Sequence, residues 1–255
     1  MPRALIVGAS RGLGLEFAKQ YADEGWSVLA THRAPADAER LREIGAQPLA
    51  LDVLDPNAPA TLAAALAEGA PSSSESAASP EADAASLEGT EPTGSSPGAS
   101  LDLVVLNAGI HGPRQIRIEH PPSVTDFDAV MHTNVLGPMR LLAVLVHPLE
   151  KAKGTLALVT SRMGSVSAAS TPNSLLYRVS KAAENMLAKV AHVELSPLGV
   201  RVLALHPGWV RTDMGGPDAD VGIEESVRGM RRVLGDALSY PSGCFFDWRG
   251  ESLAW

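Results

Sequence analysis

The 255-residue chain has little cysteine, few aromatic side chains (4%) and no excess of positive charge. Its one cysteine, Cys244, excludes an internal disulfide framework and fits a reducing compartment. Lys and Arg number 21 against 29 Asp and Glu, a net charge of −8. Because phosphate groups are bound by clustered Lys and Arg, we expect no nucleic-acid partner and no anionic-membrane partner.

Long apolar runs are also missing. The run at residues 4–7 is too short for a signal peptide, and the run Leu141–Val146 is far shorter than the ~20 apolar residues of a spanning helix. We therefore expect a soluble, cytoplasmic protein.

Residues 69–100 contain no Lys or Arg and a single Leu among nine Ser, seven Ala, four Pro and four Gly. Such a segment cannot bury enough apolar surface to offset the entropy lost on ordering it. We expect a low-complexity, disordered insertion at the surface. The rest of the chain has 21 basic and 24 acidic residues, a net charge of −3.

Outside that segment, apolar strand-like runs alternate with segments of helical periodicity. This alternation predicts a mostly parallel sheet with helices on both faces. We expect one α/β domain over residues 1–255, a doubly wound Rossmann fold with seven strands. The expected strands are 4–7, 26–31, 48–53, 101–106, 155–160, 200–205 and 244–246, and the expected helices are 13–21, 35–44, 61–68, 124–151 (interrupted near Gly137-Pro138), 174–195 and 224–238.

A glycine-rich turn, Gly8-Ala9-Ser10-Arg11-Gly12-Leu13-Gly14, joins the first expected strand to the first helix. Glycines there let the backbone approach a pyrophosphate, whose charge a helix amino terminus favours. The spacing is G-x-x-x-G-x-G, which differs from the commoner G-x-G-x-x-G dinucleotide motif. A tight strand-to-helix connection would use the same residues, but the position after the first strand favours phosphate binding.

The end of the second strand indicates which dinucleotide binds. An acidic residue there would bind the 2′-hydroxyl of NAD. This chain has Thr31-His32-Arg33 instead. Arg33 together with Arg11 would clamp a 2′-phosphate, so NADP(H) is preferred and NAD(H) is the alternative. Either arginine taken singly also fits an ordinary surface residue.

A Tyr-x-x-x-Lys pair, Tyr177 and Lys181, lies on one face of a predicted helix. A phenol has a pKa near 10, and a neighbouring ammonium lowers it, which would make Tyr177 a usable acid or base. Ser161 follows the fifth strand, where its hydroxyl would hold a substrate oxygen, and Ser165 is the alternative. Asn134 lies mid-helix, where an amide needs a partner.

Together these residues resemble the short-chain dehydrogenase/reductase family over the whole chain except about 69–100. The glycine turn, Asn107-Ala108-Gly109, Asn134, Ser161, Tyr177/Lys181 and Pro207-Gly208 occur in the family's order. Residues 160–165 and 206–216 and the final Trp255 are similar to the C-factor/sniffer-type carbonyl reductase branch. Val7 and Leu106 depart from the family, which usually has Thr and often has Asn there.

The resemblance implies roles for these residues. Tyr177 would exchange the proton with the substrate oxygen, and Lys181 would lower the pKa of Tyr177 and bind the nicotinamide ribose. Ser161 would orient the substrate, and Asn134 would hold a water of the proton relay. The implied cofactor-binding residues are Gly8, Ser10, Arg11, Gly12, Leu13, Gly14, Arg33, Asp52, Val53, Asn107, Ala108, Gly109, Tyr177, Lys181, Pro207, Gly208, Val210 and Thr212.

The sequence therefore predicts an NADP(H)-dependent oxidoreductase acting on a small carbonyl or alcohol substrate. The alternative is a nucleotide-binding signalling or regulatory protein with little turnover, and an epimerase or dehydratase is a weaker third option. No Cys/His/Asp spacing indicates a metal site. The resemblance implies a homodimer or homotetramer. Glycines at 215, 216 and 222 suggest that residues 214–235 form a mobile lid.

Overall fold

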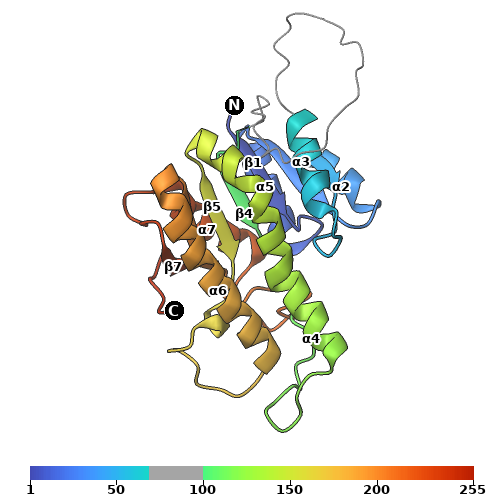
Figure 1. Cartoon of the computed structure of the whole chain (residues 1–255), viewed down its shortest axis with the longest axis vertical. Coiled ribbons are helices and arrows are strands. Elements are labelled where there is room, and N and C mark those ends of the chain that lie inside the picture. The colour runs from blue at the N-terminus through green and yellow to red at the C-terminus, as the bar shows by residue number, and fades with distance from the viewer. Residues whose placement is uncertain (69–99) are drawn as a thin grey trace, which may run out of the picture.

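The structure is a computed structural model that describes residues 1–68 and 100–255 (Figure 1). The predicted insertion, apart from Ser100, lies outside the described residues. Seven strands form one sheet in the order β3-β2-β1-β4-β5-β6-β7, and all neighbouring pairs are parallel. The predicted doubly wound α/β fold is confirmed, with a sheet that is parallel throughout. The strands are β1 (Arg3–Val7), β2 (Ser27–His32), β3 (Gln47–Ala50), β4 (Leu103–Leu106), β5 (Thr155–Val159), β6 (Arg201–His206) and β7 (Cys244–Asp247).

The helices fill the connections between strands. Two of them end two residues before a glycine, Gly25 or Gly45, with a φ of 78°. That left-handed conformation costs glycine nothing and stops a helix. The helical segments are α1 (Gly12–Asp23), α2 (Asp37–Glu43), α3 (Ala58–Glu68), α4 (Val124–Met131), η1 (His132–Leu136), α5 (Gly137–Ala152), η2 (Arg162–Gly164), α6 (Leu175–Leu195), η3 (Ser196–Leu198) and α7 (Ile223–Gly235).

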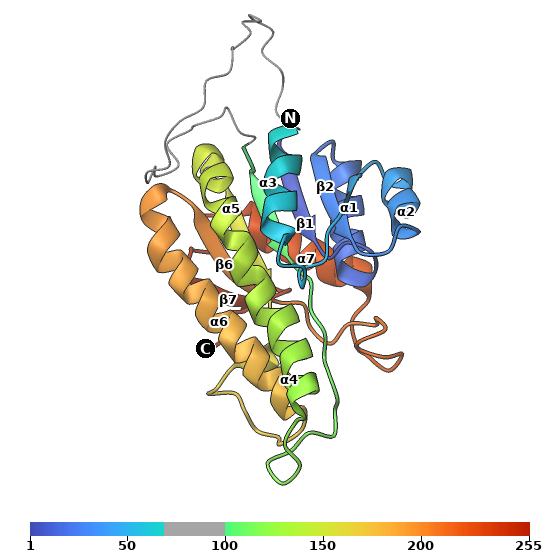
Figure 2. The same ribbon diagram turned by 45° about the vertical axis from the view of Figure 1, so that its right-hand side comes forward.

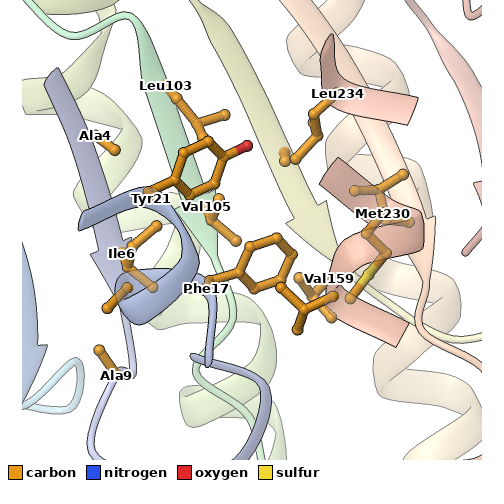
Figure 3. Close-up of a cluster of buried hydrophobic side chains, with 14 of the residues drawn as sticks. Ala4, Ile6, Ala9, Phe17, Tyr21, Leu103, Val105, Val159, Met230 and Leu234 are labelled. Atoms are coloured by element: carbon orange, nitrogen blue, oxygen red, sulfur yellow. The ribbon is translucent and has the colours of Figure 1, made fainter. Parts of the chain in front are cut away.

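Two apolar cores lie on the two faces of the sheet, and β1 contributes side chains to both. Its alternate residues Ala4 and Ile6 join one core, and Leu5 and Val7 join the other, because successive strand residues point to opposite faces. Helices α1, α2 and α7 cover the first face, where Phe17 and Met230 pack (Figure 3). Helices α3, α5 and α6 cover the second face (Figure 2).

Helices α4, η1 and α5 run on as one 29-residue helix, Val124–Ala152. By length and composition this helix is apolar enough to cross a membrane, a criterion that the core helices of globular proteins also meet. Here Leu141, Leu145 and Leu149 are fully buried in the core over the second face of the sheet. The helix therefore contributes to the packing of the fold.

The interruption expected near Gly137-Pro138 is a π-helical turn, η1, which contains Asn134. Pro138 has no N–H, so the carbonyl of Asn134 has no α-helical donor four residues on. The helix continues through a wider π-helical turn instead of breaking. Such turns inside α-helices are frequent at functional sites.

The lid predicted over residues 214–235 is too long. Its second half is α7, and Val227, Met230 and Val233 of that helix are buried in the core. Packed apolar contacts hold α7 in place, so it is part of the fold. The irregular segment before α7 is the part that borders the site.

Candidate active site

The glycine turn after β1 is packed so closely that side chains do not fit. A Cβ on Gly8, which has a φ of 82°, would lie 2.8 Å from the Cα of Ala108, and one on Gly14 would lie 2.0 Å from the carbonyl oxygen of Gly8. Thr31 Oγ1 accepts the Gly8 N–H at 2.9 Å, and Asn107 Nδ2 donates to the Gly8 carbonyl at 2.9 Å. Although Val7 and Leu106 depart from the family pattern, Thr31 and Asn107 therefore hold the turn.

A cavity of about 650 Å³ opens at the carboxyl ends of the central strands, where parallel sheets bind ligands. The turn, the strand ends and the segment after β6 enclose it. Gly8, Gly12 and Gly109 border the cavity without a side chain, so that the backbone there is open to the phosphates and riboses of a dinucleotide. Of the predicted cofactor residues, Gly8, Ser10, Arg11, Gly12, Leu13, Arg33, Asp52, Val53, Asn107, Ala108, Gly109 and Thr212 line it.

The other predicted cofactor residues lie around this cavity without lining it. Gly14 allows α1 to pack on the turn, and a Cβ on Gly208 would lie 2.8 Å from Trp248 Nε1. The Pro207 carbonyl accepts a hydrogen bond from Ser226 at 2.6 Å, and Val210 is buried in the core. These residues shape the segment after β6.

Basic side chains lie at the end of the cavity beside β2 and the glycine turn. Arg33 is exposed on its rim. Arg11 pairs with Asp213 at 2.8 Å, but both side chains are more than two-thirds exposed, so the pair is weak and open to exchange. Arg40 of α2, which the sequence reasoning missed, donates to the Ser10 carbonyl at 3.3 Å. The guanidinium groups of Arg11 and Arg40 therefore lie at the turn, and that of Arg33 lies on the rim of the same cavity.

Tyr177, Ser161 and Lys181 come together beside β5. The Ser161 hydroxyl lies near enough to the phenol of Tyr177 to lower its pKa, and it accepts the Met163 N–H at 3.1 Å, which orients it. Lys181 Nζ lies 5.7 Å from the centroid of the Tyr177 ring and donates to the Val159 carbonyl at 3.2 Å. The structure therefore places a hydroxyl, a phenol and an ammonium in one buried group.

The pKa of Tyr177 is raised, opposite to the direction expected from Lys181 alone. Burial is the largest cause, and the Glu184 carboxylate adds to it, whereas Lys181, Ser161 and Arg114 each lower the value. The phenol is therefore protonated at neutral pH. The sequence showed the ammonium but did not show how deeply the phenol is buried.

Asn134 is fully buried and fully hydrogen-bonded. Its Oδ1 accepts the Ile110 N–H at 2.8 Å, and its Nδ2 donates to the Ile110 carbonyl and to Ser180 Oγ, each at 2.9 Å. Ser180 Oγ in turn donates to the Tyr177 carbonyl at 2.9 Å. The Asn134 side chain thus links the segment after β4 to the helix that carries Tyr177.

Ser165, the alternative to Ser161, has a different partner. Its hydroxyl donates to the backbone carbonyl of Trp255 at 3.3 Å, as the Ser167 hydroxyl does at 2.9 Å. The Trp255 ring stacks on Phe245 at 5.5 Å. Ser165 thus anchors the carboxyl terminus, and the geometry favours Ser161 as the hydroxyl that acts with Tyr177.

The imidazole of His111 also contacts the phenol ring. Its ring stacks on that of Tyr177 with centroids 4.5 Å apart, and burial lowers its pKa. Arg114 from the same segment donates to the Met214 carbonyl at 2.6 Å, joining two loops beside the site. Arg114 is exposed and His111 is half-buried, and nothing in the sequence indicates the stacking of His111 on Tyr177.

Glu184 is the buried residue that sequence reasoning missed. Its Oε2 lies 2.6 Å from Lys181 Nζ, and both side chains are 5% exposed. Burial raises the pKa of Glu184 to about 7, against the opposing effect of Lys181. The signal was available, because Glu184 lies three residues after Lys181 on the same predicted helix face.

The described residues include no candidate metal-binding cluster. No group of three or more His, Cys, Asp or Glu side chains in residues 1–68 and 100–255 is arranged to hold a metal ion. The neutral His206, whose pKa burial lowers to about 4, is near Asp247 and Arg162 at the end of β6.

Comparisons with known proteins show the family and the fold. Residues 2–71 and 95–220 match the family model described as short chain dehydrogenase. The chain is 39% identical to the C-signal of Myxococcus xanthus over 156 residues, which is 61% of this chain and 93% of that protein. It is similar to the NADPH-bound carbonyl reductase from chicken fatty liver (TM-score 0.82, 29% identity, covering 100% of this chain and 99% of that one). The carbonyl reductase Sniffer of D. melanogaster has the same fold (TM-score 0.82, 24% identity, both chains fully covered).

Proposed function

The chain belongs to the short-chain dehydrogenase/reductase family, and from that membership we propose that it is an NADPH-dependent carbonyl reductase. The observation that carries the proposal is the buried Ser161–Tyr177–Lys181 group beside a cavity lined by the glycine turn. The likeness to an NADPH-bound carbonyl reductase supports the same activity.

Each residue of the group has a task in the proposed reaction. The nicotinamide cofactor, when bound in the cavity, supplies the hydride. Ser161 holds the substrate oxygen next to the phenol, and Tyr177 donates its proton to that oxygen as it becomes an alcohol. Lys181 holds positive charge beside the phenolate that is left, and Asn134 fixes α6 relative to the segment after β4.

The protonated state of Tyr177 favours the reductive direction. A general acid must carry its proton before the reaction, and burial keeps the pKa of this phenol above its ordinary value. Oxidation of an alcohol would require the phenolate, which the site disfavours at neutral pH. The free site therefore holds Tyr177 in the protonated form that a general acid of carbonyl reduction requires.

The proposal is tested by binding and turnover. We expect NADPH fluorescence titration to show tighter binding than NADH, and a panel of aldehydes and ketones to reveal NADPH-dependent reduction. Arg33→Ser should weaken NADPH binding about 10–100-fold, the contribution of a charge-assisted hydrogen bond, and leave NADH binding unchanged. Arg42→Ser is the matched control, because Arg42 pairs with Glu39 on the surface of α2.

Two outcomes of that experiment would change the proposal. Tighter binding of NADH would contradict the role of Arg33. Cofactor binding without turnover over the whole panel would favour a nucleotide-binding regulatory protein, the second candidate, which the identity of 39% to a protein named C-signal supports.

The two serines give a further prediction. Ser161→Ala removes the hydroxyl beside the Tyr177 phenol and should lower kcat/KM for reduction by about 10²-fold, as loss of a group that stabilises the transition state does. Ser165→Ala changes a hydroxyl that bonds Trp255 and should keep near wild-type turnover. Steady-state kinetics of both variants decide between them, since the reverse pattern would assign the role to Ser165.

A further inference from the structure

Three ionisable side chains follow one face of α6: Tyr177, Lys181 and Glu184. They lie at positions i, i+4 and i+7, which are neighbours along a helix. The carboxylate lies 2.6 Å from the ammonium, and the ammonium lies 5.7 Å from the ring centroid of the phenol. Glu184 is therefore joined to the phenol through Lys181.

Burial makes this carboxylate unusual. A charged pair removed from water is often no more stable than apolar side chains of the same volume, so packing alone does not explain Glu184. Its neighbours on the buried side of α6 include Ala188, Ala191 and Leu195, which pack in the apolar core. The carboxylate lies on the turn of α6 that carries Lys181, next to the proposed reaction centre.

We propose that Glu184 is a positioning residue of the Tyr177–Lys181 pair, holding the ammonium in place and offsetting its charge so that the phenol keeps its proton. This inference rests on the proposed function. The ammonium is held by the Glu184 carboxylate and by the Val159 carbonyl of β5. Glu184 thus limits how strongly Lys181 acts on Tyr177.

The charges that face these groups fix the sign of the effect. On Tyr177 act Lys181 and Glu184 from α6, the Ser161 hydroxyl from the segment after β5 and Arg114 from the segment after β4. Burial opposes the charge of Lys181, but Glu184 and Tyr177 outweigh it and raise its pKa. Removing the negative charge of Glu184 lowers the pKa of Lys181 as well; while Lys181 keeps its proton, its positive charge is uncompensated, so the phenolate is stabilised and the pKa of Tyr177 falls.

The test starts with the protein without cofactor. Phenolate formation is followed by near-ultraviolet absorbance against pH, and subtraction of the Tyr177→Phe curve isolates Tyr177 from Tyr21 and Tyr240. Burial raises the pKa of Tyr21 to about 12. In Glu184→Gln we expect the Tyr177 transition to move to lower pH by about one unit, as expected for removal of a charge several ångströms away.

Matched variants separate position from charge. Glu194→Gln makes the same change on an exposed part of α6 and should leave the transition in place. Glu184→Asp keeps the charge and should restore most of the wild-type titration. If Glu184→Gln folds and its Tyr177 transition is unchanged, or if Glu194→Gln shifts it equally, the inference is wrong.

The loaded enzyme gives a second readout. Reduction needs a protonated phenol, so kcat falls as pH rises through the apparent pKa of Tyr177. In Glu184→Gln this alkaline limb should move to lower pH, with KM for the carbonyl substrate within about twofold of wild type. Absence of turnover in the wild type would refute the proposed function, whereas the cofactor-free titration decides the role of Glu184 independently.

Discussion

Replacing Tyr177 with phenylalanine is expected to slow NADPH-dependent carbonyl reduction by about 10²–10⁴-fold, the usual contribution of a positioned general acid. The change removes the phenol hydroxyl beside Ser161 and leaves the ring, which fills a buried position and stacks on His111 at 4.5 Å. NADPH affinity and the free energy of unfolding should therefore change little. Steady-state kinetics, NADPH fluorescence titration and thermal unfolding measure the three quantities.

Tyr240→Phe serves as the control for this experiment. Tyr240 meets Phe246 edge-on at 5.2 Å, away from Ser161 and Lys181, so loss of its hydroxyl should leave turnover within about twofold of wild type. If Tyr177→Phe reduces a responsive carbonyl as fast as wild type, Tyr177 is not the proton donor. A fall in NADPH affinity that matches the fall in rate would assign Tyr177 to cofactor binding instead.

The sequence predicted those parts of the site that follow from strand ends and helix periodicity. Glycines at 8, 12 and 14 mark the turn after β1, and Asn107 follows β4 directly, so both had to lie at the same edge of the sheet. The Tyr177/Lys181 spacing placed both side chains on one helix face. These are local patterns, and the parallel sheet brings them together.

Other parts depend on contacts that local patterns do not encode. The pKa of Tyr177 is set by burial and by Glu184, and the sequence reasoning weighed Lys181 alone. Asn134 is linked to Tyr177 through Ser180: the Asn134 side chain bonds Ser180, which lies 46 residues further along the chain, and Ser180 bonds the Tyr177 carbonyl. The helix that was read as part of a lid is packed over the sheet because Val227 and Met230 face the core. Periodicity identified that helix but not the surface it would cover.

Gly164, in η2 after β5, lies in close contact with the backbone of α6. A Cβ on Gly164 would lie 2.5 Å from the carbonyl carbon of Lys181 and 2.7 Å from the amide nitrogen of Ala182. Both are backbone atoms of a helix that packs on β6 and on the sheet, so neither side can yield without moving α6. If a Cβ at Gly164 displaced α6, Tyr177 and Lys181 would move with that helix. Ser161 would not, because it belongs to the segment that carries Gly164.

Gly164→Ala is therefore expected to lower kcat by about 10²-fold, since a misplacement of about 1 Å has that effect on catalysis. Overpacking should also lower the free energy of unfolding by about 1–3 kcal/mol. Gly235→Ala is the control, because Gly235 ends α7 with open space around its Cβ position, and it should keep wild-type turnover. Chemical unfolding and single-turnover kinetics of the two variants measure both effects. Wild-type kcat in Gly164→Ala would mean that the contact between η2 and α6 does not position the phenol, and that the other contacts of Tyr177 and Lys181 suffice to hold it.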